Sequence, residues 1–339
     1  MSVTIKDVAR EAEMSVATVS RALNDHDSVT RETREHIRAI AKRLRYVPHA
    51  AARSLITRRT ETLGVVLPDL YGEFFSELIR GIDAAARERG LHLLVSSSHG
   101  SASETGAALR ALSGRVDGIL IMSPHAPTAH LADDVPVTTP VVLMNTRSQG
   151  EGYLSLAIDN HGGAWKMVEH LVGAGYRRIA LIGGPADNFD AQERLRGYRD
   201  ALAHFAKGSV AQVLDGDFSE ESGHVAGVAI AALKPRPDAV FAANDMMALG
   251  CLHAFRDAGL RVPQDIAVAG FDDIPIARFV APGLTTMRVN IAELGGRAAR
   301  ALIASLTGPP PPATHQVLAP DLVVRASTSA LRRTHEDSS

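Results

Sequence analysis

Apolar residues recur at helical spacing in three short stretches near the start of the chain. The first follows Thr4, which together with Asp7 has the form of a capping box. The second has Ser15 as its cap and runs to about Leu23, and the third opens at Thr30 and covers Arg31 to Leu44. Three short helices with a tight connection between the first two are typical of a helix-turn-helix head, which we place at residues 1–47.

The outward face of the second predicted helix carries small, hydroxylated or cationic side chains. These are Val16, Ala17, Thr18, Ser20 and Arg21. Such a face can approach base edges closely and still donate hydrogen bonds to phosphates. The pattern alone leaves open an ordinary amphipathic bundle without a nucleic-acid role.

Charge favours the nucleic-acid interpretation. Residues 1–59 contain 12 Lys and Arg against 7 Asp and Glu, a net charge of +5. The remaining residues contain 24 against 31, a net charge of −7. A basic head on an acidic body suits phosphate binding.

A slim, alanine-rich segment follows the head at residues 48–60. Pro48 suits the first turn of a short helix, and Leu55 lies near its end. A narrow helix that presents an apolar side chain fits a minor groove, where the side chain can part a base step. We therefore predict a hinge helix and linker in this segment.

From Thr62 onward, short apolar runs alternate with helical patterns, which predicts parallel strands with crossover helices. The expected fold is α/β: an all-α head plus a core of two doubly wound, parallel-sheet lobes with a ligand cleft between them. We assign residues 61–159 to the first lobe with a return segment at about 290–320. Residues 160–289 form the second lobe with a return segment at about 321–329, and residues 330–339 form a disordered tail.

Composition and missing motifs exclude several classes. The chain has 339 residues, 45% of them hydrophobic, with one cysteine and no apolar run long enough to cross a bilayer. Its first residues do not resemble a signal peptide, so we expect a cytoplasmic protein. Nucleotide-binding, metalloprotease and serine-hydrolase motifs are missing, so we expect no enzyme and no cofactor. Among the 14 histidines, His125 and His130 lie closest in sequence but lack a third ligand, so we expect no metal site.

Several motifs together resemble the lactose/galactose repressor (LacI/GalR) family over residues 3 to about 329. In the head and hinge they are Thr4–Ala9, Ser15–Arg21, Tyr46-x-Pro48 and Ala52–Leu55. In the body they are Gly183-Gly184-Pro185, Arg194–Tyr198, Ala243–Gly250, Val262–Asp265, Gly270–Asp273 and Leu284–Thr286. The body thereby resembles a type I periplasmic sugar-binding fold.

The resemblance implies a homodimer that reads a palindromic operator, with the predicted helix Phe74–Arg89 in the dimer face. Leu55 would be the minor-groove wedge. Base-edge contacts are assigned to Val16, Ala17 and Arg21, and phosphate contacts to Thr18, Ser20, Asn24 and Thr33. The remaining DNA-binding assignments are Thr4, Ser15, Tyr46, His49, Ala52 and Arg53.

The resemblance also implies a small-molecule effector, and a repressor of carbohydrate-metabolism genes. The assigned effector contacts are Asp190, Arg194, Phe218, Asn244 and Asp272, with Asp69, Phe74, Phe75, Asn145 and Arg147 from the first lobe.

Alternatives stay open for several of these assignments. Arg194 alternatively serves as a surface ion-pair partner, Phe218 as core, and one of the adjacent Phe74 and Phe75 as core. Asp245 is expected to cap a helix and is left out of the site. The effector is a sugar or a non-sugar such as a nucleobase, a sugar phosphate or an acid. A solute-binding protein and an enzyme on the same lobes are the less favoured functions.

Overall fold

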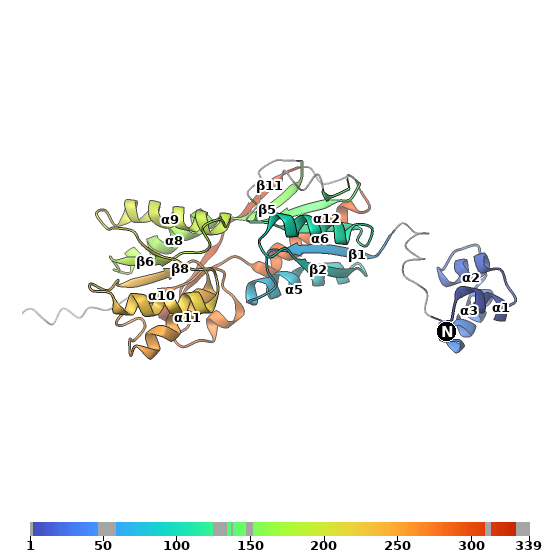
Figure 1. Cartoon of the computed structure of the whole chain (residues 1–339), viewed down its shortest axis with the longest axis horizontal. Helices are drawn as coiled ribbons and strands as arrows, with labels where there is room; N and C mark the ends of the chain where they lie inside the picture. Colours follow the sequence, from blue (N-terminus) through green and yellow to red (C-terminus); the bar gives the residue numbers. More distant parts are fainter. Residues whose placement is uncertain are drawn as a thin grey trace, which may run out of the picture. The chain divides into compact units, whose positions relative to one another are not determined.

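The computed structural model describes residues 3–46, 59–124, 134–136, 138–146, 152–308 and 313–329. The chain divides into two compact units, Met1–Thr60 and Glu61–Ser339. Figure 1 shows both. The predicted hinge helix, the proline run at 309–312, the histidine pair His125 and His130, and the tail at 330–339 lie outside the described residues.

The first unit is a three-helix head. Its helices are α1 (Ile5–Glu11), α2 (Val16–Leu23) and α3 (Arg31–Arg43). Val8, Val19 and Ile37 are fully buried where the three helices meet. Ser15 Oγ accepts a hydrogen bond from the Thr18 backbone N–H at 3.1 Å, so the predicted cap at the start of α2 is confirmed.

The first lobe of the second unit contains a six-stranded parallel sheet in the order β11-β5-β4-β3-β1-β2. Its strands are β1 (Thr62–Leu67), β2 (His92–Ser97), β3 (Gly118–Met122), β4 (Val141–Met144), β5 (Leu154–Ile158) and β11 (His315–Leu318). Its helices are α5 (Glu73–Arg87), α6 (Ala102–Leu112) and α12 (Ile291–Ser305).

Alternate residues of the central strands enter two different cores, which shows that this sheet is covered on both faces. Val65 and Leu120 pack with the apolar residues of α5 and α12. Val66 and Ile121 point the other way and pack with Leu109 of α6. This arrangement explains why the strands read as continuous apolar runs in the sequence.

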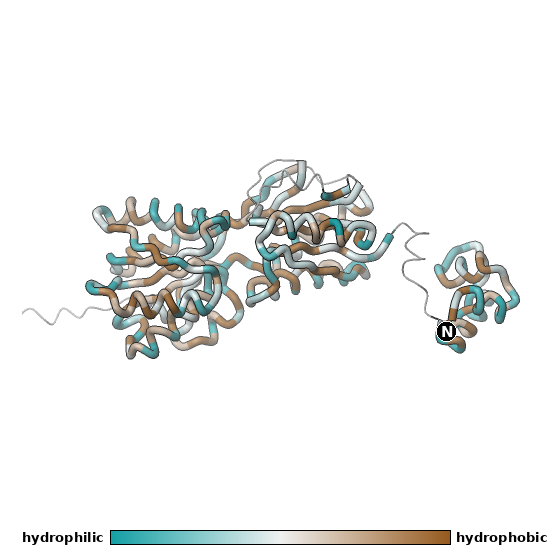
Figure 2. The backbone as a smooth tube through the Cα atoms, viewed as in Figure 1, coloured by the Kyte–Doolittle hydropathy of each residue, from teal (hydrophilic) through white to brown (hydrophobic). Residues whose placement is uncertain are grey.

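The second lobe contains a four-stranded parallel sheet in the order β7-β6-β8-β9. Its strands are β6 (Ile179–Ile182), β7 (Gln212–Leu214), β8 (Ala239–Ala242) and β9 (Ala267–Ala269). Its helices are α8 (Asn160–Gly173), α9 (Phe189–Phe205), α10 (Glu220–Ala232) and α11 (Asp245–Asp257). Figure 2 shows apolar stretches in the interior strands of both lobes, and alternating apolar and polar positions along the outer helix α9.

The chain crosses between the lobes three times. It leaves β5 for α8, returns from β10 (Thr286–Arg288) to α12, and leaves β11 for β12 (Asp321–Val323). β10 and β12 pair antiparallel, with Thr286 opposite Val323. Short 3₁₀ turns at Pro275–Arg278 and Ala326–Thr328 complete the second lobe. No helix within the described ranges is long and apolar enough to cross a membrane.

Candidate functional site

A cavity of about 90 Å³ lies where the carboxyl ends of strands from both lobes meet. Several predicted effector residues line it, from segments far apart in the sequence. The lining residues are Pro68, Phe74, Phe75, Met122, Pro124, Asn188, Asp190, Arg194, Phe218, Asn244 and Asp272. An open α/β sheet collects ligand-binding groups at this edge, as the sequence analysis expected.

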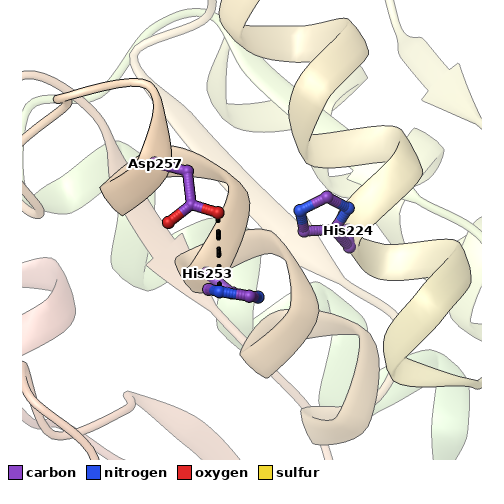
Figure 3. A group of neighbouring side chains, drawn as sticks. All are labelled: His224, His253 and Asp257. Carbon is purple, nitrogen blue, oxygen red and sulfur yellow. Dashed lines mark ion pairs between the residues drawn. The ribbon is translucent and has the colours of Figure 1, made fainter.

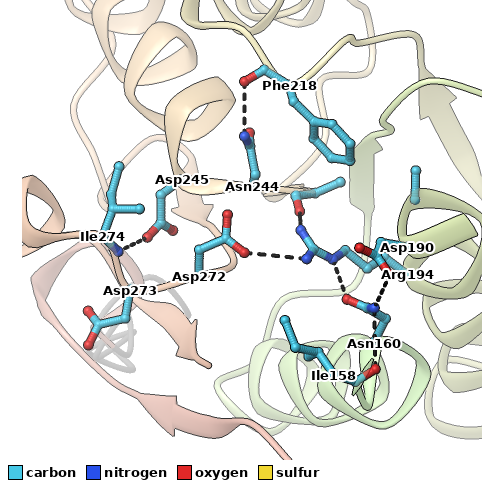
Figure 4. A network of polar contacts seen from close by, with 12 residues as sticks. Ile158, Asn160, Asp190, Arg194, Phe218, Asn244, Asp245, Asp272, Asp273 and Ile274 are labelled. Atoms are coloured by element: carbon cyan, nitrogen blue, oxygen red, sulfur yellow. Dashed lines mark hydrogen bonds and ion pairs between the residues drawn. The ribbon is translucent and has the colours of Figure 1, made fainter. Parts of the chain in front are cut away.

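A buried polar network centred on Arg194 forms one side of the cavity (Figure 4). Arg194 is 4% exposed, so it is not a surface ion-pair partner. Its Nε donates to Asn160 Oδ1 at 2.8 Å, its Nη1 donates to the Ala243 carbonyl, and its Nη2 lies 3.3 Å from Asp272 Oδ1. Asn160 Nδ2 in turn donates to Asp190 Oδ1 at 2.8 Å. One guanidinium thus links two carboxylates, directly and through an amide.

Aromatic rings enclose the apolar part of the site. The guanidinium carbon of Arg194 lies 3.9 Å from the ring centroid of Phe271 and 5.9 Å from that of Phe218. Phe74 and Phe75 meet edge to face, with ring centroids 5.4 Å apart. Both are half-buried, and each lines the cavity and also packs against the main core, so the two rings do not divide into one core and one cavity residue. Phe218 likewise lines the cavity and packs against the main core from there.

Burial shifts the two network carboxyls towards their neutral forms. Desolvation raises the pKa of Asp190 to about 6, although Arg194 and Asn160 oppose the shift. Desolvation, together with the nearby Asp190, raises the pKa of Asp272 to about 7 against the opposing effect of Arg194. Both carboxyls therefore change charge close to neutral pH.

The roles of Asn244 and Asp245 differ from those expected. Asn244 is the residue that caps α11, because its side chain accepts a hydrogen bond from the Met247 N–H at 2.9 Å. Its Nδ2 donates to the Phe218 carbonyl at 2.9 Å, so the amide supports the cavity wall. Asp245 does not cap the helix. It is fully buried and accepts hydrogen bonds from the Ile274 N–H and the Thr286 hydroxyl.

Three weaker candidates from the first lobe have different outcomes. Asp69 is exposed, does not line the cavity, and accepts hydrogen bonds from the N–H groups of the two residues that follow it. Asn145 is buried, lowers the pKa of Asp190, and has side-chain atoms without a partner of normal hydrogen-bond geometry. Arg147 lies outside the described residues.

Asn160 and Asn188 belong to the site but were missed. Asn160 was recognised only as a boundary between lobes, whereas it joins Asp190 to Arg194. Asn188 lines the cavity and caps α9 through the Ala191 N–H. For Asn188 the available signal was its position directly before a helix, since Asn is common as an N-cap. Asn160 lies inside the first turn of α8, after the cap Asp159, and has no such signal.

The head presents the predicted reading face to solvent. Ser15, Val16, Ala17, Arg21, Asn24 and Thr4 are exposed, and Thr18, Ser20 and Thr33 are half-buried. Tyr46 packs partly against the head core. His49, Ala52, Arg53 and Leu55 lie outside the described residues. The DNA contacts of all these residues stay predictions.

Both parts of the chain match known families. Residues 4–49 match the bacterial regulatory proteins of the lacI family, and residues 168–328 match the periplasmic binding protein-like domain. The HTH-type transcriptional regulator CelR of Thermobifida fusca is 35% identical, over 96% of this chain and 98% of its own length. The chain belongs to the LacI family. The ribose operon repressor of Escherichia coli K12 is 36% identical, over 96% of this chain and 99% of its own length.

Solved structures of LacI-family proteins share the fold. The Lac repressor dimer bound to operator and the anti-inducer ONPF has a TM-score of 0.86 at 30% identity, covering 97% of this chain and 100% of its own. The CelR–cellobiose complex has a TM-score of 0.69 at 34% identity, covering 96% and 99%. The α/β fold with a helix-turn-helix head is thereby confirmed. Like these relatives, this protein is a DNA-binding transcriptional regulator and not an enzyme.

Proposed function

We propose that this regulator binds a palindromic operator as a homodimer, and that a neutral sugar in the cavity controls its affinity for DNA. We propose further that it is a repressor of carbohydrate-metabolism genes that the sugar releases from DNA. The observation that carries the effector assignment is the pair of carboxylates, Asp190 and Asp272, on either side of an already engaged Arg194.

The charge of the cavity favours a neutral ligand over an anionic one. Of the lining residues that the structure describes, Arg194 is the one cation, against the two carboxyls of Asp190 and Asp272. All three nitrogens of its guanidinium already face Asn160, Ala243 and Asp272. A phosphate or carboxylate ligand would therefore add negative charge where none of the described lining residues offers a free cation to pair with it.

The cavity also has the two components that sugar binding requires. Carboxylate and amide oxygens accept hydrogen bonds from hydroxyl groups, and the rings of Phe74, Phe75 and Phe218 offer apolar surface to the C–H faces of a sugar. Two LacI-family structures support this proposal, since the CelR complex holds cellobiose and a regulator from Enterococcus faecium holds ribose.

The dimer proposal rests on the likeness to the Lac repressor dimer on its operator. Its two-fold symmetry would present two heads to two half-sites. In this chain the exposed α2 positions Val16 and Ala17 are small and apolar, so we expect readout there to depend on thymine methyl groups and on Arg21.

A thermal-shift screen of the full chain tests the effector. Neutral monosaccharides and disaccharides are compared with the matching sugar phosphates and sugar acids. We expect a neutral sugar to raise Tm, because it binds the folded state alone. A shift with anionic compounds only, or with none of the compounds, would overturn the proposal.

Variants then assign the shift to the cavity. Asp190→Asn should abolish it, whereas the exposed Asp69→Asn, outside the cavity, should retain it. Selection of duplexes from a random pool identifies the operator. Adding the active sugar should then weaken operator binding, and Arg21→Ala should weaken it on the selected sequence more than on random DNA.

A further inference from the structure

Helices α10 and α11 of the second lobe cross in near backbone contact. A Cβ at Gly250 would fall 1.9 Å from the Glu220 carbonyl oxygen, and one at Gly223 would fall 2.1 Å from that of Met247. Only glycine fits at such a crossing, so these two glycines allow the backbones of the two helices to lie close together. Side chains beside the crossing are therefore held close together.

Three potential metal ligands lie beside this crossing (Figure 3). His253 and Asp257 are four residues apart on α11 and so share one face of the helix. His224 on α10 faces them, with its ring centroid 5.3 Å from that of His253. One ligand atom from each of the three lies within 4.8 Å of the other two.

We propose that His224, His253 and Asp257 form a binding site for a divalent transition-metal ion of the Zn²⁺ class. Two imidazoles and one carboxylate are ligands that Zn²⁺ accepts, at about 2.0–2.2 Å each. In a tetrahedral site this places ligand atoms about 3.4 Å apart. His253 Nε2 and Asp257 Oδ2 are already 3.5 Å apart.

The side chains are free to complete the geometry. Those of His253 and Asp257 are 53% and 56% exposed, and that of His224 is half-buried, so small rotations bring the three atoms around one ion. The same exposure leaves the fourth coordination position to water. Arg256 Nε, 3.6 Å from Asp257 Oδ1, is the competing cation at the carboxylate.

The ion would join two helices that begin just after residues of the cavity wall. α10 follows Phe218 and α11 follows Asn244, and these two residues are hydrogen-bonded to each other. A metal ion bound between α10 and α11 would stabilise the packing of these two helices in the folded state. From the sequence we expected no metal site, because the histidines are scattered and the pair closest in sequence lacks a third ligand. His224 lies on a different helix from His253 and Asp257, so spacing along the chain does not show that the three are neighbours.

Calorimetric titration of the chelator-treated full chain with Zn²⁺ tests the site. We expect one tight site per chain, a higher Tm with Zn²⁺ and no effect of Mg²⁺. His224→Gln and His253→Gln should each weaken binding at least tenfold, with Tm in the absence of metal unchanged. Bound Co²⁺ should show the visible absorption of low-coordinate cobalt in the wild type and lose it in both variants.

The matched control is His92→Gln, an exposed histidine on β2 that should leave binding unchanged. The chain has 14 histidines, so weak binding elsewhere is expected. Zn²⁺ affinity and stoichiometry that are the same in the wild type and in the His224 and His253 variants would overturn the proposal. Loss of binding in the control as well would also overturn it.

Discussion

The side chains of Arg194 and Asp272 are each 5% exposed, and Nη2 of the first lies 3.3 Å from Oδ1 of the second. Removing one partner from a buried ion pair leaves the other charge without compensation, which costs about 3–5 kcal/mol. Arg194→Leu should therefore lower the free energy of unfolding by about this amount at pH 8. The loss should be smaller at pH 5, where the carboxyls bind protons.

Urea denaturation at both pH values measures this effect. The matched control is Arg196→Leu on the same helix, where the arginine side chain is 57% exposed and pairs with Glu193. We expect the control to change stability by less than about 0.5 kcal/mol. An equal loss in the two variants would contradict the role assigned to the buried network.

The buried carboxyl of Asp245 should make stability depend on pH. Burial, together with the nearby Asp272, raises the pKa of Asp245 well above its ordinary value of 3.8. The folded state therefore binds a proton that the unfolded chain releases at lower pH. Stability from this group is complete below pH 3.8 and is lost as pH rises through the folded-state pKa.

Asp245→Asn removes this titration but keeps the shape of the side chain. The variant should be less sensitive to pH than the wild type between pH 5 and 8, by up to about 1.4 kcal/mol per pH unit. Unfolding free energies at four pH values decide the matter. Parallel pH profiles for the two proteins would show that Asp245 does not titrate in this range.

A methyl group at Gly81 should disrupt the packing of α5 against α12. The added Cβ would fall 1.9 Å from the Ala292 carbonyl oxygen. We expect Gly81→Ala to cost about 3 kcal/mol, measured by urea denaturation. Gly173→Ala is the control, because nothing lies within 4 Å of its Cβ at the end of α8, and it should be neutral or slightly stabilising. Similar losses for both glycines would argue against the tight crossing.

The cap of α2 can be separated from the DNA contacts of the same helix. Ser15→Ala removes the bond to the Thr18 N–H and should destabilise the helix by about 1 kcal/mol. Amide hydrogen exchange over α2 should then be several-fold faster. Ser20→Ala removes a predicted phosphate contact and should weaken DNA binding without faster exchange. Unchanged exchange in the Ser15 variant would contradict the capping role.

Local signals were sufficient to predict much of the fold. Ser15 and Thr30 were recognised as the starts of helices from their place before an apolar period, and both cap the helices that follow. β5, β10 and β11 were not recognised as strands. β10 is only three residues long, and no residue of β11 is buried, so neither strand has a strong apolar pattern of its own. They are strands because of the partners they pair with.

The site residues were predictable where they lie in family motifs, and not where their roles depend on packing. Arg194 and Asp272 were found from family motifs. The capping of α11 by Asn244 in place of Asp245 was not predicted, because either side chain can cap a helix. Only the folded structure shows that Asp245 instead accepts hydrogen bonds from the Ile274 N–H and the Thr286 hydroxyl. His224 and His253 are brought together by a glycine-lined crossing that no local pattern encodes.

The three crossovers between the lobes restrict how the body can move. A single connection would let the lobes swivel and twist freely about it. Three chain segments connect the lobes, and two of them continue into the paired strands β10 and β12. Together they act as a hinge with a single axis. The lobes can open and close about this hinge, while the three connections resist twisting of one lobe against the other. We therefore expect occupation of the cavity to change mainly the angle between the lobes about these segments.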